Sequence, residues 1–91
     1  MATINLPPAM TITQATSIQQ QGNELLACDD LDIDFSAVKE VDSSALAVLF
    51  TWQRFAARNQ RSINLTTALP QGIITLAEVY SVSDLLPKPA V

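Results

Sequence analysis

The chain has 91 residues, of which 48% are apolar and 15% are charged, so it can form one domain with its own core and is too apolar for intrinsic disorder. Its net charge of −4, with five basic residues, leaves too little positive charge for a nucleic-acid-binding face. The absence of histidine removes the commonest general base and the usual metal ligand, and we expect no catalytic residues and no metal or cofactor site.

The first elements expected along the chain are two short strands. Alternating apolar residues within residues 1–8 predict a strand at a sheet edge, which ends at Pro7 and Pro8. Met10 and Ile12 alternate after the prolines and predict a second edge strand.

A helix is expected over residues 13–27. Apolar residues recur there at helical spacing, and Thr13 is a suitable N-cap. Gly22 and the glutamines before it weaken this prediction, because a glycine inside a helix costs about 1 kcal/mol relative to alanine.

The next apolar residues alternate with aspartates. Leu31, Ile33 and Phe35 predict a strand with one polar face. The aspartates are spaced as at the start of a calcium-binding loop: Asp30, Asp32 and Asp34. Such a loop needs glycine and glutamate where this chain has Phe35 and Val41, so we expect the strand and no calcium site.

The strongest helical pattern covers residues 42–59. Its apolar face comprises Ala45, Val48, Leu49, Trp52, Phe55 and Ala56. We expect Trp52 to be buried in the core. Arg54, Arg58 and Arg61 form a basic stripe near the end of this helix, where they complement the negative end of the helix dipole or, alternatively, meet an acidic partner or a phosphate.

A further strand and helix are expected in the last third of the chain. Ile63 and Leu65 predict a short strand, and Pro70 begins a third helix. The apolar stripe of this helix comprises Ile73, Leu76, Ala77 and Tyr80. Leu85 and Leu86 are expected to pack back on the domain.

Strands that alternate with helices predict an α/β fold with a mixed, mostly parallel sheet of about four strands and three helices. We expect a single domain over residues 1–91, with a frayed tail at residues 88–91. Cys28 is the only cysteine, no signal peptide is evident, and the longest apolar run, residues 45–50, is far too short to span a membrane. We therefore expect a cytoplasmic protein without membrane insertion.

The start of the second helix holds the candidate functional residues Asp42, Ser43 and Ser44. The ordinary interpretation is a helix cap, because all three side chains can accept from the unpaired amides of the first turn. The positive end of the helix dipole also favours a phosphate added to Ser44 or Ser43.

Leu46, Ala47 and Phe50 extend the apolar surface of this helix beyond the single stripe that a sheet-packed helix needs. Either neighbouring elements cover these side chains, or they form a patch that contacts another protein. The candidate partner-binding surface is therefore Asp42, Ser43, Ser44, Leu46, Ala47 and Phe50.

Residues 31–38 and 41–47 resemble the STAS domain, the fold of bacterial anti-sigma factor antagonists. In that family, a strand ending in Asp-Leu-Ser is followed by Asp-Ser-Ser-Gly-Leu at a helix start. Here the corresponding residues run Asp42-Ser43-Ser44-Ala45-Leu46, with alanine where glycine is usual. The resemblance covers most of the chain and implies a STAS-like domain that carries out no chemistry.

Residues 75–80 and 84–87 resemble one branch, the small cytosolic STAS subunit of the Mla phospholipid-transport ABC complex. This resemblance implies a subunit that binds the ATPase of a complex serving outer-membrane lipid asymmetry, at the inner face of the membrane. In this branch a residue with a hydroxyl group directly follows the aspartate, and the corresponding residue here is Ser43.

Two other functions stay open. In sigma-factor antagonists the phosphorylated serine corresponds to Ser44, and the partner would then be a kinase-type anti-sigma factor. The last alternative is a structural module in which neither serine affects a partner.

Overall fold

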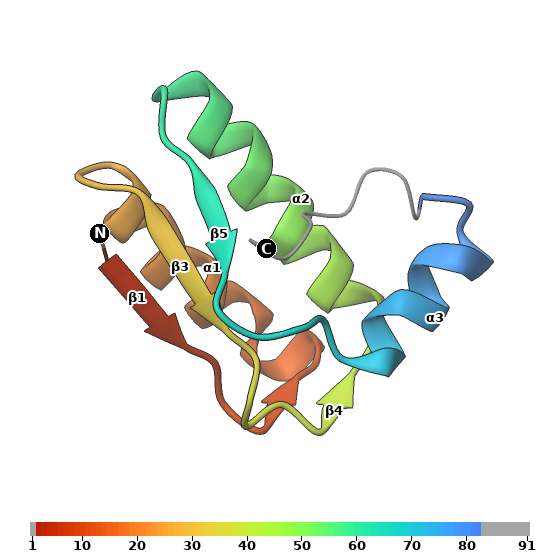
Figure 1. Cartoon of the computed structure of the whole chain (residues 1–91). Helices are drawn as coiled ribbons and strands as arrows, with labels where there is room; N and C mark the ends of the chain where they lie inside the picture. The colour runs from red at the N-terminus through yellow and green to blue at the C-terminus, as the bar shows by residue number, and fades with distance from the viewer. Residues whose placement is uncertain (1, 83–91) are drawn as a thin grey trace.

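The computed structural model describes residues 2–82, in which three helices alternate with five short strands (Figure 1). The strands are β1 (Ala2–Asn5), β2 (Ala9–Met10), β3 (Leu31–Asp34), β4 (Glu40–Val41) and β5 (Ile63–Leu65). The helices are α1 (Ile12–Leu26), α2 (Ser43–Arg58) and α3 (Gln71–Val79). The predicted α/β class with three helices is confirmed.

The strands form two small sheets, one with the order β1-β3-β5 and one that pairs β2 with β4. Every pairing between the described strands is parallel, in agreement with the mostly parallel sheet that the sequence predicts. The second edge strand does not extend the main sheet, because it pairs with β4 instead. Two residues are too few to show alternation, so the sequence pattern does not predict β4.

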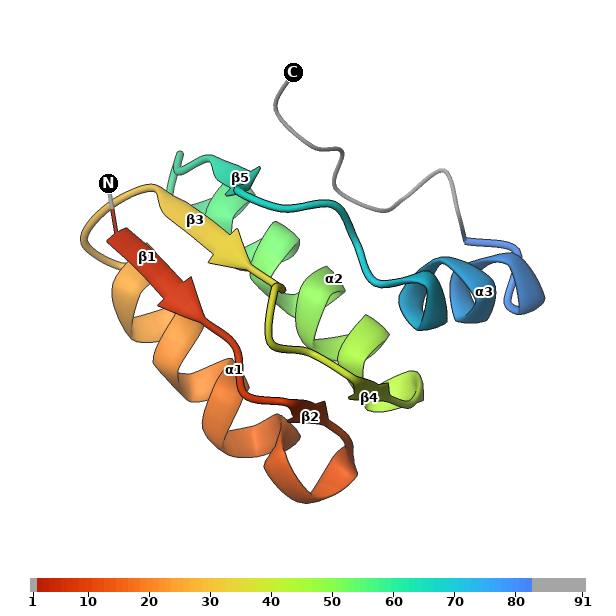
Figure 2. The same cartoon turned by 60° about the horizontal axis from the view of Figure 1, so that its bottom comes forward.

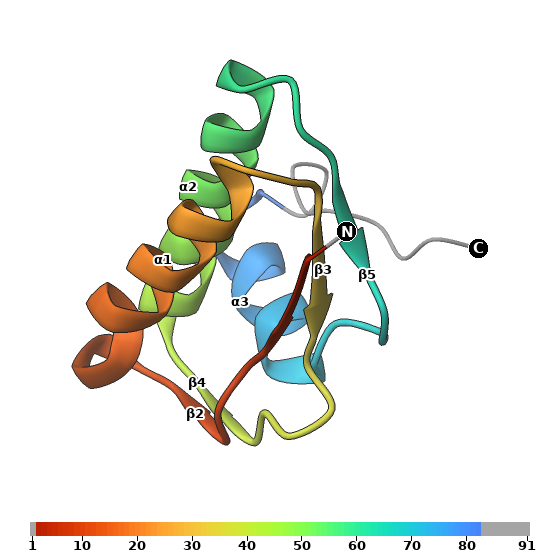
Figure 3. The same cartoon turned by 90° about the vertical axis from the view of Figure 1, so that its left-hand side faces the viewer.

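Helices α1 and α2 lie side by side on one face of the main sheet, and no described helix covers its other face (Figures 2 and 3). Ile4, Ile33 and Leu65 share one register position across the three strands and are buried. Asp32 and Asp34 alternate with the buried residues of β3 and stay partly exposed. The predicted strand with one polar face is therefore confirmed.

The two helices meet where Trp52 of α2 lies against Gly22 of α1. Trp52 is fully buried, and its indole Nε1 donates to the carbonyl oxygen of Gln19 at 3.1 Å. A Cβ atom on residue 22 would lie 2.2 Å from Trp52 Cε2, so this position leaves no room for a side chain. Burial of Trp52 is confirmed, and the glycine that weakens the helix pattern is needed for this contact.

Three predictions at the ends of elements are wrong. Ile12 does not extend β2 but begins α1, and its side chain is 75% exposed. The N-cap is Thr11 rather than Thr13, because Gln14 Oε1 accepts from the Thr11 amide and hydroxyl in a capping box. Tyr80 does not belong to the buried stripe, because it is the C-cap of α3, where the chain leaves the helix, and it is 56% exposed.

Helix α3 packs against α2 and β4, beyond the end of the main sheet (Figure 1). Ile73 and Ala77 are its fully buried residues, as the apolar stripe predicts. Leu85 and Leu86, and the tail at residues 88–91, lie outside the described residues.

Candidate functional site

The starts of α1 and α2 are joined by the carboxylate of Asp42. The pairing of β2 with β4 brings the two helix starts together, since each strand lies directly before one of the helices. Asp42 is the N-cap of α2, and its Oδ1 accepts from the Ser44 amide at 2.8 Å. Its Oδ2 accepts from the Ile12 amide at 3.1 Å. One side chain therefore caps two helices, which a linear pattern does not reveal.

These contacts determine the charge of Asp42. Desolvation raises the pKa of its carboxyl group. Hydrogen bonds from the amides of Ser44 and Ile12 and from the Ser44 side chain lower this pKa by a larger amount, so the net pKa lies below the usual 3.8. Asp42 is consequently ionised at neutral pH. Its negative charge faces the positive ends of two helix dipoles.

The two serines differ in their surroundings. Ser43 is the first residue of α2 and is exposed. Ser44 is partly buried, and its amide donates to Asp42 Oδ1 at 2.8 Å. Ser43 is therefore the hydroxyl that another protein can contact without disturbing the cap.

The apolar part of the predicted surface is smaller than expected. Leu46 is 4% exposed and belongs to the core, which corrects its placement at the surface. The reason is that α2 is packed against α1, β5 and α3, so that only a strip of the helix faces solvent. Ala47 lies on this strip and is exposed, and Phe50 is partly buried at its edge. Ala45 is 1% exposed, so its methyl group fills the core rather than the space of a partner.

Ile12 is the residue that the sequence analysis misses. Its side chain has the highest exposed fraction of any large apolar residue in the described chain, at 75%. Its amide contacts Asp42, so it lies next to the start of α2. An alternating pattern with Met10 hides this isoleucine, because it suggests a strand where the first turn of α1 begins.

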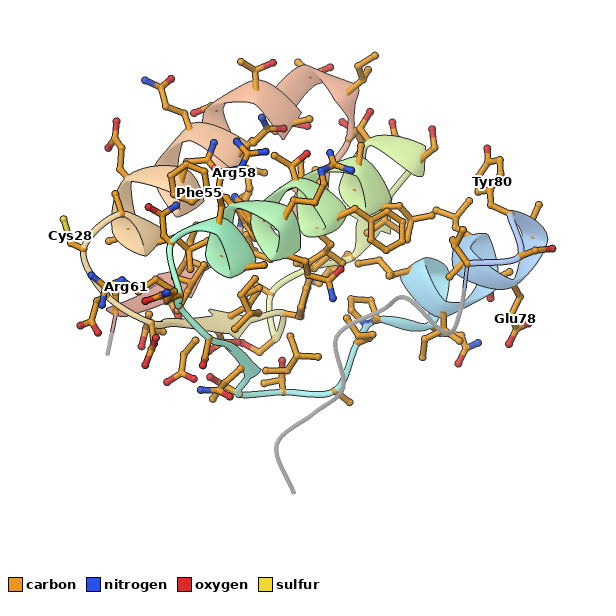
Figure 4. The ribbon with its side chains drawn as sticks, turned by 90° about the horizontal axis from the view of Figure 1, so that it is seen from above. Cys28, Phe55, Arg58, Arg61, Glu78 and Tyr80 are labelled. Atoms are coloured by element: carbon orange, nitrogen blue, oxygen red, sulfur yellow. The ribbon has the colours of Figure 1, made fainter. Side chains whose placement is uncertain are left out.

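The basic stripe does not form one site. Arg54 and Arg58 are exposed on α2, whereas Arg61 follows the helix and is partly buried. In Figure 4, Arg61 lies toward the end of the molecule that carries Cys28, and Tyr80 projects from α3 at the opposite end. Arg54 differs from the others because it lines a groove of about 390 Å³ beside Phe50.

The comparisons with known proteins agree with this architecture. A family model described as "Mlab, STAS domain" matches residues 2–87, nearly the whole chain. The comparison with curated protein sequences finds no match for the chain. Within residues 2–82, no helix is both long and apolar enough to cross a membrane, and no three acidic, cysteine or histidine side chains gather as a metal site.

Proposed function

The chain belongs to the STAS domain family, and from this premise we propose that it is a non-catalytic cytosolic subunit that docks on the ATPase of a phospholipid-transport ABC complex. The exposed strip at the start of α2 would be the docking surface, with Ser43 as its polar contact and Ala47 and Phe50 as its apolar contacts. The protein would support the assembly and activity of that ATPase at the inner face of the membrane.

The observation that carries this proposal is that Asp42 holds the helix start in place while the neighbouring Ser43 stays exposed. Asp42 is fully engaged in capping α1 and α2, which fixes the geometry of the helix start. Ser43 stands beside it at the surface, followed one turn later by the exposed Ala47. Because the charge at this helix end is already hydrogen-bonded to two backbone amides, a partner can cover the helix end without leaving Asp42 unpaired.

Ser43→Glu is expected to weaken binding to the purified ATPase subunit at least tenfold, because a charge placed in a buried contact must be desolvated without a partner. Titration calorimetry with the ATPase measures this change. A carboxylate in the first helical turn interacts favourably with the helix dipole, so the thermal melting of the variant should stay near that of the wild type.

Two controls isolate the cause. Ser43→Gln adds bulk without charge and should weaken binding less than Ser43→Glu. Ser62→Glu makes the same change at an exposed residue that follows the C-terminal end of α2, opposite the end that carries Ser43, and should bind normally. Wild-type affinity of Ser43→Glu would refute the docking proposal.

The second candidate function is a switch operated by phosphorylation of Ser44. The hydrogen bond from the Ser44 amide to Asp42 supports it, because it places Ser44 beside the carboxylate that holds both helix starts, and a phosphate on Ser44 would repel that carboxylate. Incubation with a kinase-type anti-sigma factor, followed by mass spectrometry, should then show one phosphate that Ser44→Ala removes. An unmodified chain under these conditions rejects the switch.

A further inference from the structure

The exposed strip of α2 continues beyond the proposed docking residues. Ser43, Ala47, Phe50 and Arg54 are separated by four, three and four residues, so they follow one face of the helix. At a rise of about 1.5 Å per residue, this face is roughly 16 Å long. A partner segment that contacts Ser43 and lies along α2 therefore reaches Arg54.

A groove of about 390 Å³ lies at the far end of this face. Among residues 2–82, its lining comprises Phe50, Gln53 and Arg54 of α2 and Val82, which follows α3. Phe50 and Val82 are also packed against the hydrophobic core, which holds the walls in place. The stems of Gln53 and Arg54 add methylene groups, so the groove offers room for an apolar side chain.

Arg54 places a positive charge at the rim of this groove. Its guanidinium donates to the Thr51 hydroxyl, at 3.4 Å within the same helix, and no carboxylate of residues 2–82 forms an ion pair with it. The side chain is exposed, and the chain as a whole carries a net charge of −4. An unpaired arginine on an otherwise acidic domain is complementary to a carboxylate supplied from outside.

We propose that this groove receives an apolar side chain of the ATPase subunit, with an adjacent carboxylate of the same segment paired to Arg54. This inference rests on the proposed function. It specifies a partner segment that carries both an acidic and an apolar side chain and that runs along α2 from Ser43 to Arg54. The ion pair lies at the rim and contributes mainly to association rate and specificity, while the apolar side chain excludes water from the groove.

The test compares charge reversals on one helix in titrations with the purified ATPase subunit. Arg54→Glu is expected to weaken binding about tenfold and to reduce the dependence of affinity on salt concentration. Arg58→Glu is the matched control, because Arg58 is also exposed, one turn further along α2, but does not line the groove. Its affinity should stay within about threefold of the wild type.

The outcomes separate this inference from the docking proposal. If Ser43→Glu disrupts binding but Arg54→Glu matches Arg58→Glu, the groove is not a contact and only this inference fails. If the wild-type chain does not bind the ATPase, both fail. A double variant, Leu85→Ser with Leu86→Ser, tests the chain's own C-terminal residues as the occupant. A fall in the melting temperature of the free chain, with unchanged affinity for the ATPase in this variant and in Arg54→Glu, would overturn the proposed partner contact.

Discussion

Replacing Gly22 with alanine is expected to lower the free energy of unfolding by about 2 kcal/mol and the melting temperature by about 10 °C. The new methyl group would lie 2.2–2.5 Å from three atoms of the Trp52 indole, which is fully buried and hydrogen-bonded to Gln19. Because the indole is buried, either it or the helix backbone must shift against the packed core to admit the methyl group. The cost of this overlap exceeds the gain of up to about 1 kcal/mol that alanine brings to a helix. Thermal and chemical denaturation measure the loss.

The other glycine of the chain provides the control. A Cβ atom on Gly72 would approach only the Cγ2 methyl group of Val41, at 2.6 Å, and residue 72 itself is exposed in the first turn of α3. Gly72→Ala should therefore cost less than Gly22→Ala. Combining Gly22→Ala with Trp52→Leu should cost less than the sum of the two single changes, because the smaller side chain relieves the overlap. Additive losses would show that the two residues are not in conflict.

This contact also marks the limit of sequence-based prediction for the fold. Helical periodicity predicts α2 and the burial of Trp52, and alternation predicts β3, because both follow from one chain segment and its nearest neighbours. The need for Gly22 depends on a residue 30 positions away in another helix. From its own segment alone, the glycine only lowers the predicted stability of the helix. The correct interpretation requires the crossing of α1 and α2.

The candidate site was likewise only partly predictable from the sequence. The composition of residues 42–44 predicts a capped helix start without choosing among its three residues, and in the structure Asp42 is the cap. The burial of Leu46 and the exposure of Ile12 are not predictable from periodicity, because they depend on where α1 and α3 lie around α2 and on a capping box at Thr11. The surface that remains for a partner is what the other helices leave uncovered.

Asp42→Ala is expected to lower the melting temperature by about 10 °C, because it removes the side-chain acceptor of two helix starts, each of which contributes about 5 °C in a domain of this size. The lost bonds are those from the Ser44 and Ile12 amides. Docking should weaken as well, since Ser43 would no longer be held at a fixed position. Circular dichroism melts and the same calorimetric titration give the two measurements.

Asp42→Asn separates the two contacts. Asparagine is a good N-cap, so its Oδ1 can still accept from the Ser44 amide, but its Nδ2 cannot accept from Ile12. The melting temperature of this variant should fall by about half as much as that of Asp42→Ala. Asp34→Ala is the matched control, because the Asp34 carboxylate also accepts a backbone hydrogen bond, at 2.8 Å from Ser36, but joins no helices. A loss for Asp34→Ala as large as that for Asp42→Ala would contradict the special position of Asp42.

Acid should narrow the difference in melting temperature between Asp42→Ala and the wild type. The pKa of Asp42 is lower in the folded chain than its usual 3.8, so the ionised carboxylate stabilises the fold at neutral pH. This contribution is lost as the pH falls below 3.8 and through the folded pKa, because the protonated group accepts the two amides poorly. The melting temperatures of the two proteins should therefore approach each other as the pH falls below 3.8 and stay apart from pH 5 to 8. A constant gap across this range would mean that Asp42 acts through packing rather than through its charge, and the joined helix starts would then need another explanation.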